Sequence, residues 1–128
     1  MTSLRMLPLV QAVLFAAASL VHAGVLLGGY EHSHAATAEG IIAVVLLASV
    51  VGSFVWPGSI RTLTLAAQGF ALVGTLVGVF TMTVGVGPQT TADYVLHALL
   101  LALLVAGLAI AWLHPEIRPS GNSTPEQR

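Results

Sequence analysis

Four long apolar stretches, separated by short polar segments, constrain the fold of this chain more than any other feature of its sequence. They span approximately residues 7–29, 36–56, 63–86 and 92–113. About 20 mostly apolar residues are enough for a helix to cross the hydrocarbon core of a bilayer. Only 7% of the 128 residues are charged, whereas a soluble domain carries about a quarter. The sequence therefore predicts an all-α, polytopic membrane protein with four transmembrane helices.

The connections between these stretches are short, which predicts an up-down bundle. Helices joined by a few residues have to run antiparallel, so we expect the first helix to contact the second and the fourth. Pro57 with Gly58, and Gly87 with Pro88, mark the ends of the second and third helices. Together these features predict one four-helix transmembrane domain over residues 1–113.

The basic residues give the bundle an orientation. Arg5, Arg61, Arg118 and Arg128 are the only Lys or Arg residues, and in an up-down bundle all four lie on one side. The positive-inside rule makes that side cytoplasmic, so both termini and a flexible tail over residues 114–128 are expected in the cytoplasm. This predicts a multi-pass protein of a bacterial inner (plasma) membrane. The formal charge of −1 gives no reason to expect a nucleic-acid partner.

The N-terminal 24 residues also have features of a secretory signal peptide, namely a basic start, an apolar stretch and a small-residue end. The apolar run continues past the candidate cleavage site, and His22 would lie beside the scissile bond. These two observations favour a first helix that is retained.

Ionisable side chains inside a membrane span are costly, so each one needs an explanation. His22 lies about seven residues before the outer end of the predicted first helix, roughly 10 Å by helical rise. His97 lies at a similar depth in the predicted fourth helix, with Asp93 one turn before it on the same face. Glu39 lies near the outer end of the second helix. The sequence thus predicts a His/carboxylate site in the outer half of the bundle.

The loop above this site holds Glu31, His32 and His34, which are further candidate contributors. Structural explanations compete with the functional one. Thr90 and Asp93 fit a capping box at the start of the fourth helix, and Glu39 could interact with a helix dipole. The three loop residues could simply be solvated.

Three chemistries suit the predicted site. A divalent iron, manganese or zinc ion accepts mixed nitrogen and oxygen ligands, here His22, Glu39, Asp93 and His97. A haem b could be held between His22 and His97, but the outer face has no Lys or Arg for the propionates, which lowers haem below a metal ion. A proton relay or quinone site could use the same groups without a cofactor. The absence of Cys excludes thiolate ligands.

Small residues recur at four-residue spacing on two of the predicted helices, a pattern that lets helices approach closely in lipid. They are Gly74 and Gly78 on the third helix, and Ala98, Ala102 and Ala106 on the fourth. Packing within one subunit explains such rows. A homo-oligomer or a larger membrane complex is the alternative.

Two segments, HSHAATAEGIIAVVLL and AQGFALVGTLVGVFTMTVGVGPQTTADYVLH, resemble a group of small bacterial four-helix integral membrane proteins without an assigned activity. The shared signature is similar to G-x-G-P-x-T-x-x-D-x-x-x-H, with A-E-G at the second helix. Its positions in this chain are Gly85, Gly87, Pro88, Thr90, Asp93 and His97, with Ala38, Glu39 and Gly40. The resemblance implies a common fold and a common outer site, and it supplies no substrate.

The leading functional hypothesis from the sequence is a small membrane protein that binds a metal ion or related cofactor in its outer half. The alternatives are an accessory or assembly subunit of a larger membrane complex, a proton- or ion-conducting oligomer, and an enzyme acting on a lipid or quinone. The sequence leaves open whether the protein is an enzyme.

Overall fold

The computed structural model describes residues 2–114, and every regular element in this range is helical. The order is α1 (Thr2–His22), α2 (Ser33–Val55), the short 3-10 helix η1 (Pro57–Ser59), α3 (Ile60–Thr83) and α4 (Thr91–Leu113). Each of the four α-helices is long and apolar enough to cross a membrane. The prediction of an all-α chain with four such helices is therefore confirmed for residues 2–114. Beyond His114, the predicted tail lies outside the described residues.

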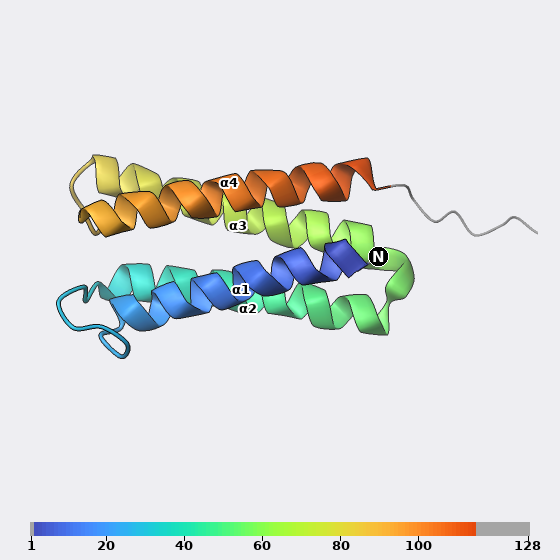
Figure 1. The fold of residues 1–128 in the computed structure, drawn as a ribbon, viewed down its shortest axis with the longest axis horizontal. Helices are drawn as coiled ribbons and strands as arrows, with labels where there is room; N and C mark the ends of the chain where they lie inside the picture. The colour runs from blue at the N-terminus through green and yellow to red at the C-terminus, as the bar shows by residue number, and fades with distance from the viewer. Residues whose placement is uncertain (1, 115–128) are drawn as a thin grey trace, which may run out of the picture.

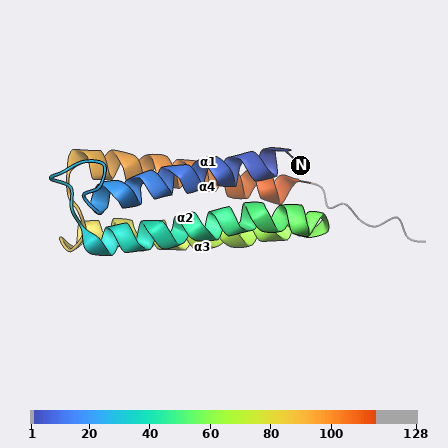
Figure 2. The ribbon, with the colours of Figure 1, turned by 90° about the horizontal axis from the view of Figure 1, so that it is seen from below.

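Consecutive helices run antiparallel along one long axis (Figure 1). α1 packs most extensively against α2, and α3 against α4, while α2–α3 and α1–α4 contacts join the two pairs. A view at right angles shows α1 beside α4 and α2 beside α3 (Figure 2). The expected contacts of the first helix with the second and fourth are present. The connections 23–32 and 84–90 lie at one end of the bundle, which we call the two-loop end; η1 lies at the other.

Two helices end earlier than the sequence predicts. α1 runs from Thr2 to His22 and not from residue 7 to 29, and α3 ends at Thr83 and not at residue 86. Hydrophobicity misplaces both ends because the apolar run continues into the following turn. The backbone ends these helices before the apolar residues do.

A glycine in the left-handed conformation ends α1. Gly24 has a φ of 72°, and its N–H donates to the carbonyl of Val21 while the N–H of Val25 donates to that of Leu20, both at 2.9 Å. This pair of bonds is the Schellman arrangement that satisfies the last carbonyls of a helix. A side chain at this φ would be strained, so glycine is needed here.

The same arrangement ends α3 at the same end of the bundle. Gly85 has a φ of 80°; its N–H donates to Met82, and the N–H of Val86 donates to Thr81. The predicted end signal, Gly87 with Pro88, therefore lies beyond the residue that stops the helix. Both connections at the two-loop end begin with one glycine-dependent turn.

The start of α4 matches its sequence signal. The Thr90 hydroxyl oxygen accepts from the Asp93 N–H at 3.3 Å, and the Asp93 carboxylate accepts from the Thr90 N–H at 2.9 Å. The predicted capping box is confirmed.

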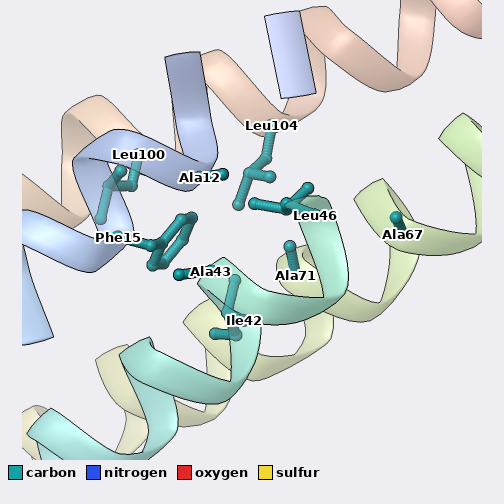
Figure 3. Close-up of a cluster of buried hydrophobic side chains, with 9 residues drawn as sticks. All are labelled: Ala12, Phe15, Ile42, Ala43, Leu46, Ala67, Ala71, Leu100 and Leu104. Atoms are coloured by element: carbon teal, nitrogen blue, oxygen red, sulfur yellow. The ribbon is translucent and has the colours of Figure 1, made fainter. Parts of the chain in front are cut away.

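Side chains from all four helices form the main apolar core. Figure 3 shows how they converge on the bundle axis. The members are Ala12, Phe15, Ile42, Ala43, Leu46, Ala67, Ala71, Leu100 and Leu104. The many alanines allow short distances between helix axes, since only a methyl group separates the backbones. Outside this core, large apolar side chains such as Val44 and Val73 are 66% and 63% exposed.

The two predicted rows of small residues face different surroundings. Gly74 and Gly78 face inward: a Cβ at Gly74 would lie 2.9 Å from Ile42 on α2, and one at Gly78 would lie 3.1 Å from His97 on α4. The other row, Ala98, Ala102 and Ala106, is exposed on α4. Close packing inside the bundle therefore explains the glycine row, and the alanine row forms part of the outer surface.

Candidate functional site

A histidine lies buried between two carboxylates at the two-loop end. His22 Nδ1 is 2.7 Å from Glu39 Oε2, and His22 Nε2 is 3.1 Å from Asp93 Oδ1. The three residues, which we call the buried triad, are only 2%, 5% and 4% exposed. They come from α1, α2 and α4, so the triad joins three helices.

Local structure positions each member of the triad. His22 is the last residue of α1, and its carbonyl accepts from the N–H of His32 at 2.8 Å, which folds the loop back over it. Glu39 lies in the second turn of α2, close to α1, because Gly40 leaves room for Ser19. A Cβ at Gly40 would lie 3.2 Å from the Ser19 hydroxyl.

The triad needs two shared protons. Both contacts of His22 join a ring nitrogen to a carboxylate oxygen, and each needs a hydrogen between the two atoms. An imidazolium between two carboxylates supplies both hydrogens, and so does a neutral imidazole with one protonated carboxyl group. In either form, two hydrogens are shared among three buried side chains.

The two carboxylates differ in how their second oxygens are satisfied. Asp93 Oδ2 accepts from the Thr90 N–H at 2.9 Å and from the Thr90 hydroxyl at 2.6 Å. Glu39 Oε1 is buried and has no hydrogen-bond partner among the described residues. A buried polar oxygen without a partner costs roughly 1–3 kcal/mol, so Glu39 is the less well satisfied carboxylate of the triad.

His97 is held one turn beyond Asp93. Its Nδ1 lies 2.8 Å from the Asp93 carbonyl oxygen. A carbonyl only accepts, so Nδ1 carries the hydrogen and, in the neutral ring, Nε2 keeps a free lone pair. Gly78 on α3 leaves the space that this end of the ring occupies.

Glu39 and His97 both line a cavity of about 330 Å³ between α2 and α3. The cavity walls are mostly apolar, with contributions from Phe15, Ile42 and Val77. Sequence reasoning missed these wall residues, because each looks like an ordinary core or lipid-facing position. The signal that could have found them is the four-residue spacing of Gly74 and Gly78, which opens this side of α3.

The loop candidates have separate positions. His32 caps α2, since its Nδ1 accepts from the Ala35 N–H at 3.3 Å, and its Nε2–H donates to the Val86 carbonyl at 3.1 Å. It therefore bridges the two connections, and its ring lies beside that of His34 on the cavity wall.

Glu31 is exposed and turns back toward its own loop. Its carboxylate accepts from the Gly29 N–H at 2.9 Å. Hydrogen bonds from its own backbone N–H and from that of Gly29 hold the pKa of the Glu31 carboxyl below its usual range. A carboxyl with a lowered pKa stabilises the loop at neutral pH, and the contact is lost as the pH falls through that pKa.

The structure brings His22, Glu39 and Asp93 together but gives His97 a different partner. The equal depth expected for the two histidines is wrong, because α1 ends at His22 and does not continue for two further turns. His22 therefore reaches the level of Asp93, at the start of α4, and His97 lies one turn deeper.

The four predicted metal ligands fall into the buried triad and a separate His97. Within residues 2–114, no three His, Asp or Glu side chains are grouped so that they could hold a metal ion. Both ring nitrogens of His22 already face carboxylates, which also leaves it no free nitrogen for a haem iron. Of the four predicted ligands, Glu39 keeps an oxygen, Oε1, without a partner among the described residues, and His97 keeps the Nε2 lone pair of its neutral ring. The metal and haem hypotheses stay predictions.

A second buried polar contact lies in the middle of the bundle. The Gln68 amide donates to Gln11 Oε1, and the Gln11 amide donates to the Leu103 carbonyl at 2.8 Å. Both glutamine side chains are fully buried. They join α1, α3 and α4 beside the main apolar core. Gly107 leaves the space for the Gln68 amide.

No protein-family model, curated protein or solved structure matches this chain. The site comprises the buried triad and the cavity beside it, with Glu39 and His97 on the cavity wall.

Proposed function

We propose that this chain is a multi-pass protein of a bacterial inner membrane, with α1 to α4 as its spans and the two-loop end facing outward. Apolar side chains exposed on the outer surfaces of the helices support membrane burial. Trp56 and Trp112 are exposed at one end of the bundle, and Tyr30 and Tyr94 at the other. Aromatic residues at both ends are typical of the two membrane interfaces.

Within this membrane protein, the cavity between α2 and α3 binds a small, largely apolar molecule whose polar group interacts with Glu39 and His97. The observation that carries this proposal is the cavity itself, an apolar hollow whose wall includes the ionisable side chains of Glu39 and His97. A ligand in the cavity would contact both side chains. The function is therefore ligand binding in the outer half of the bundle.

The cavity has the properties of a small-molecule site. Its volume of about 330 Å³ falls in the range of known ligand pockets, roughly 300–1,000 Å³. Such pockets combine apolar walls with a few placed polar groups, as Phe15 and Ile42 do here with Glu39 and His97. The contact with His22 holds the Glu39 carboxylate in position through its Oε2 atom.

A divalent iron, manganese or zinc ion is less well supported as the occupant. Within residues 2–114 no three His, Asp or Glu side chains are grouped so that they could hold a metal ion, whereas catalytic zinc sites use three protein ligands. Elemental analysis and an absorption spectrum of the purified protein test this alternative. If the purified protein contains a stoichiometric metal or shows a Soret band, and His97→Ala lacks it, the occupant is a metal ion or haem and not an organic molecule.

The binding proposal is tested by blocking the cavity. Ala38 lines it from α2, so Ala38→Phe would fill it, while Ala48→Phe places the same ring at an exposed position of the same helix outside the cavity wall. We expect native mass spectrometry of the detergent-purified protein to show a bound small molecule in the parent chain and in Ala48→Phe, but not in Ala38→Phe. Equal occupancy in all three proteins, or none in the parent chain, would contradict the proposal.

A role as accessory subunit or homo-oligomer is a second candidate. It is favoured by the row Ala98, Ala102 and Ala106, which lies exposed on α4 and would let another helix approach closely. The molecular mass in mild detergent and the set of co-purifying proteins test it. A monodisperse monomer would assign this face to lipid.

A further inference from the structure

His97 has a ring nitrogen that no group of the described chain uses. Its Nδ1–H donates to the Asp93 carbonyl at 2.8 Å, so the neutral ring keeps a lone pair on Nε2. Within residues 2–114, the fully buried side-chain atoms that lack a hydrogen-bond partner are Glu39 Oε1 and Gln68 Oε1. His97 Nε2 has no partner in this range either, but it is not one of these two atoms. Part of its surface is therefore accessible.

This nitrogen faces the part of the cavity wall that α3 forms. A Cβ at Gly78 would lie 3.1 Å from His97 Nε2, and both residues line the cavity. The neighbouring hydroxyls of Thr75 and Thr81 donate to backbone carbonyls of α3, at 2.8 and 2.7 Å. Because these hydroxyl hydrogens are already used, a ligand that satisfies Nε2 has to bring a hydrogen of its own.

A second polar side chain, His34, lies at the mouth of the cavity. α2 and α3 run antiparallel, and Gly74 faces Ile42 across the space between them. Gly78, four residues after Gly74, is therefore level with Ala38, four residues before Ile42. His34 lies four residues before Ala38, one helical turn or about 5.4 Å closer to the two-loop end. Its ring is exposed and makes no hydrogen bond with a described residue, so it is able to donate and to accept.

The cavity also opens sideways, between the outer surfaces of α2 and α3. Ala38 on α2 and Val77 on α3 line it and are themselves exposed, Val77 by 57%. In the proposed topology these surfaces face the hydrocarbon of the bilayer. A neutral molecule dissolved in the membrane can enter directly, whereas the desolvation cost disfavours an ion on this route.

We propose that the cavity binds a quinol, a neutral aromatic ring with hydroxyl groups on opposite sides, which enters from the bilayer. The inference rests on the proposed function, ligand binding in this cavity. One hydroxyl donates to His97 Nε2, and the other bonds to the ring of His34. The two oxygens of a quinol are separated by about one helical turn, which matches the offset of the two histidines along the bundle. The rigid ring fixes this separation before binding, so little conformational freedom is lost.

The same geometry discriminates against the oxidised ligand. A quinone has the same ring and the same two oxygens, but both are carbonyl oxygens that only accept hydrogen bonds. It would leave His97 Nε2 without a hydrogen and would place an oxygen lone pair against the nitrogen lone pair. We therefore expect the reduced form to bind about tenfold more tightly, the effect of one lost hydrogen bond.

The experiment compares three probes that share one tetramethyl-substituted ring: duroquinol, duroquinone and the dimethyl ether of duroquinol. The first donates hydrogen bonds, and the other two donate none. Titration calorimetry of the full chain in detergent, under argon for the quinol, measures each Kd. We expect duroquinol to bind about tenfold more tightly than either of the other probes.

Two variants assign this preference to His97. His97→Phe keeps a ring and removes the acceptor, so duroquinol should lose its advantage. Gly78→Ala should reduce the advantage, because its Cβ lies 3.1 Å from Nε2 and shields it. Gly69→Ala, on the same helix with nothing within 4 Å of its Cβ position, is the matched control and should keep the preference. A full preference in His97→Phe, or in Gly78→Ala if His97→Phe does not fold, would overturn the assignment.

A third variant tests the contact at the mouth. His34→Phe should weaken the binding of duroquinol and duroquinone alike, because the His34 ring can accept from a hydroxyl and donate to a carbonyl. The preference for duroquinol should remain, since His97 is unchanged. Unaltered Kd values in His34→Phe would overturn the second hydrogen bond.

The remaining outcomes separate this inference from the proposed function. Equal Kd values for the three probes, or tighter binding of duroquinone, would overturn the quinol inference and leave ligand binding in the cavity standing. Failure of all three probes to bind the parent chain, while Ala38→Phe still loses its co-purified molecule, would also overturn it and keep the proposed function. If no probe binds and Ala38→Phe has no effect on occupancy, neither proposal holds.

Discussion

His22 shows how much one side chain can determine at the residue scale. It is the single group that contacts both carboxylates of the buried triad, at 2.7 and 3.1 Å. Removing one partner of a buried ionic contact leaves the other charges unpaired, which costs more than the contact itself contributes. The stability of the two-loop end should therefore depend on His22.

We predict that His22→Ala lowers the free energy of unfolding by about 3 kcal/mol or more. The double variant His22→Ala/Glu39→Gln should recover part of the loss, because it removes one of the stranded charges. His34→Ala, at an exposed position, is the control and should stay within about 0.5 kcal/mol of the parent chain. The measurement is unfolding by SDS in mixed micelles, followed by circular dichroism. A loss no larger than that of His34→Ala would show that the triad does not stabilise the bundle.

Gly24 is a second example at the residue scale, because it fixes where α1 ends. An added Cβ would face a left-handed φ of 72° and would lie 2.9 Å from Glu31 Cγ. Gly29 has a φ of 90° but nothing within 4 Å of its Cβ position. The two glycines therefore separate backbone strain from steric overlap.

We predict that Gly29→Ala costs about 1–2 kcal/mol, the strain of a side chain in the left-handed region. Gly24→Ala should cost more, since Glu31 must also move. The same unfolding assay compares them, and hydrogen exchange at the end of α1 reports whether the last turn frays. Equal costs would mean that the Glu31 side chain adjusts freely.

At the scale of the elements, the pair Gln11 and Gln68 sets the spacing of α1, α3 and α4 beside the main apolar core. A Cβ at Gly107 would lie 2.5 Å from Gln68 Nε2. The Gln68 amide is fully buried and bonded to Gln11, so it cannot withdraw without losing that hydrogen bond. Gly69 has nothing within 4 Å of its Cβ position and is the matched helical glycine.

We predict that Gly107→Ala destabilises the bundle by about 1–3 kcal/mol through overpacking and the lost hydrogen bond. Gly69→Ala should be neutral or stabilise by up to about 1 kcal/mol, because alanine favours the helix. Shortening Gln68 to Ala should remove most of the penalty of Gly107→Ala. Full additivity of the two changes in thermal unfolding would show that they do not interact.

At the scale of the whole molecule, the cavity lies at one end of the bundle, and Arg5 and Arg61 lie at the other. Arg5 donates to Ser53 and Arg61 to the carbonyls of Ala111 and Trp112, all at the end opposite the buried triad. The proposed topology places the arginine end in the cytoplasm and the cavity outside. Ligands would then enter from the outer face.

The chain has no cysteine, so single cysteines can report this orientation. We predict that Glu31→Cys reacts with a membrane-impermeant maleimide in spheroplasts, in which the outer envelope is removed and the inner membrane is intact. Gly58→Cys, in η1, should react only after the membrane is permeabilised. The reverse labelling pattern would invert the topology and place the cavity toward the cytoplasm.

Residue pattern was sufficient to predict four helices, their antiparallel order and the Thr90–Asp93 cap. These depend on local physics: apolar length, short connections and side chains that bond to their own backbone within a turn. The pattern also identified the four residues His22, Glu39, Asp93 and His97, because ionisable groups in apolar helices are rare enough to stand out.

The pairing of those residues could not be read from the pattern. It depends on Gly24, whose left-handed turn ends α1 at His22 although the apolar residues continue. That end places His22 opposite Asp93 and leaves His97 to face α3, where Gly78 makes room. A backbone conformation and a contact between distant helices decide this, and neither leaves a hydrophobic signal along the chain. The cavity between α2 and α3, with Glu39 and His97 on its wall, follows from the same packing.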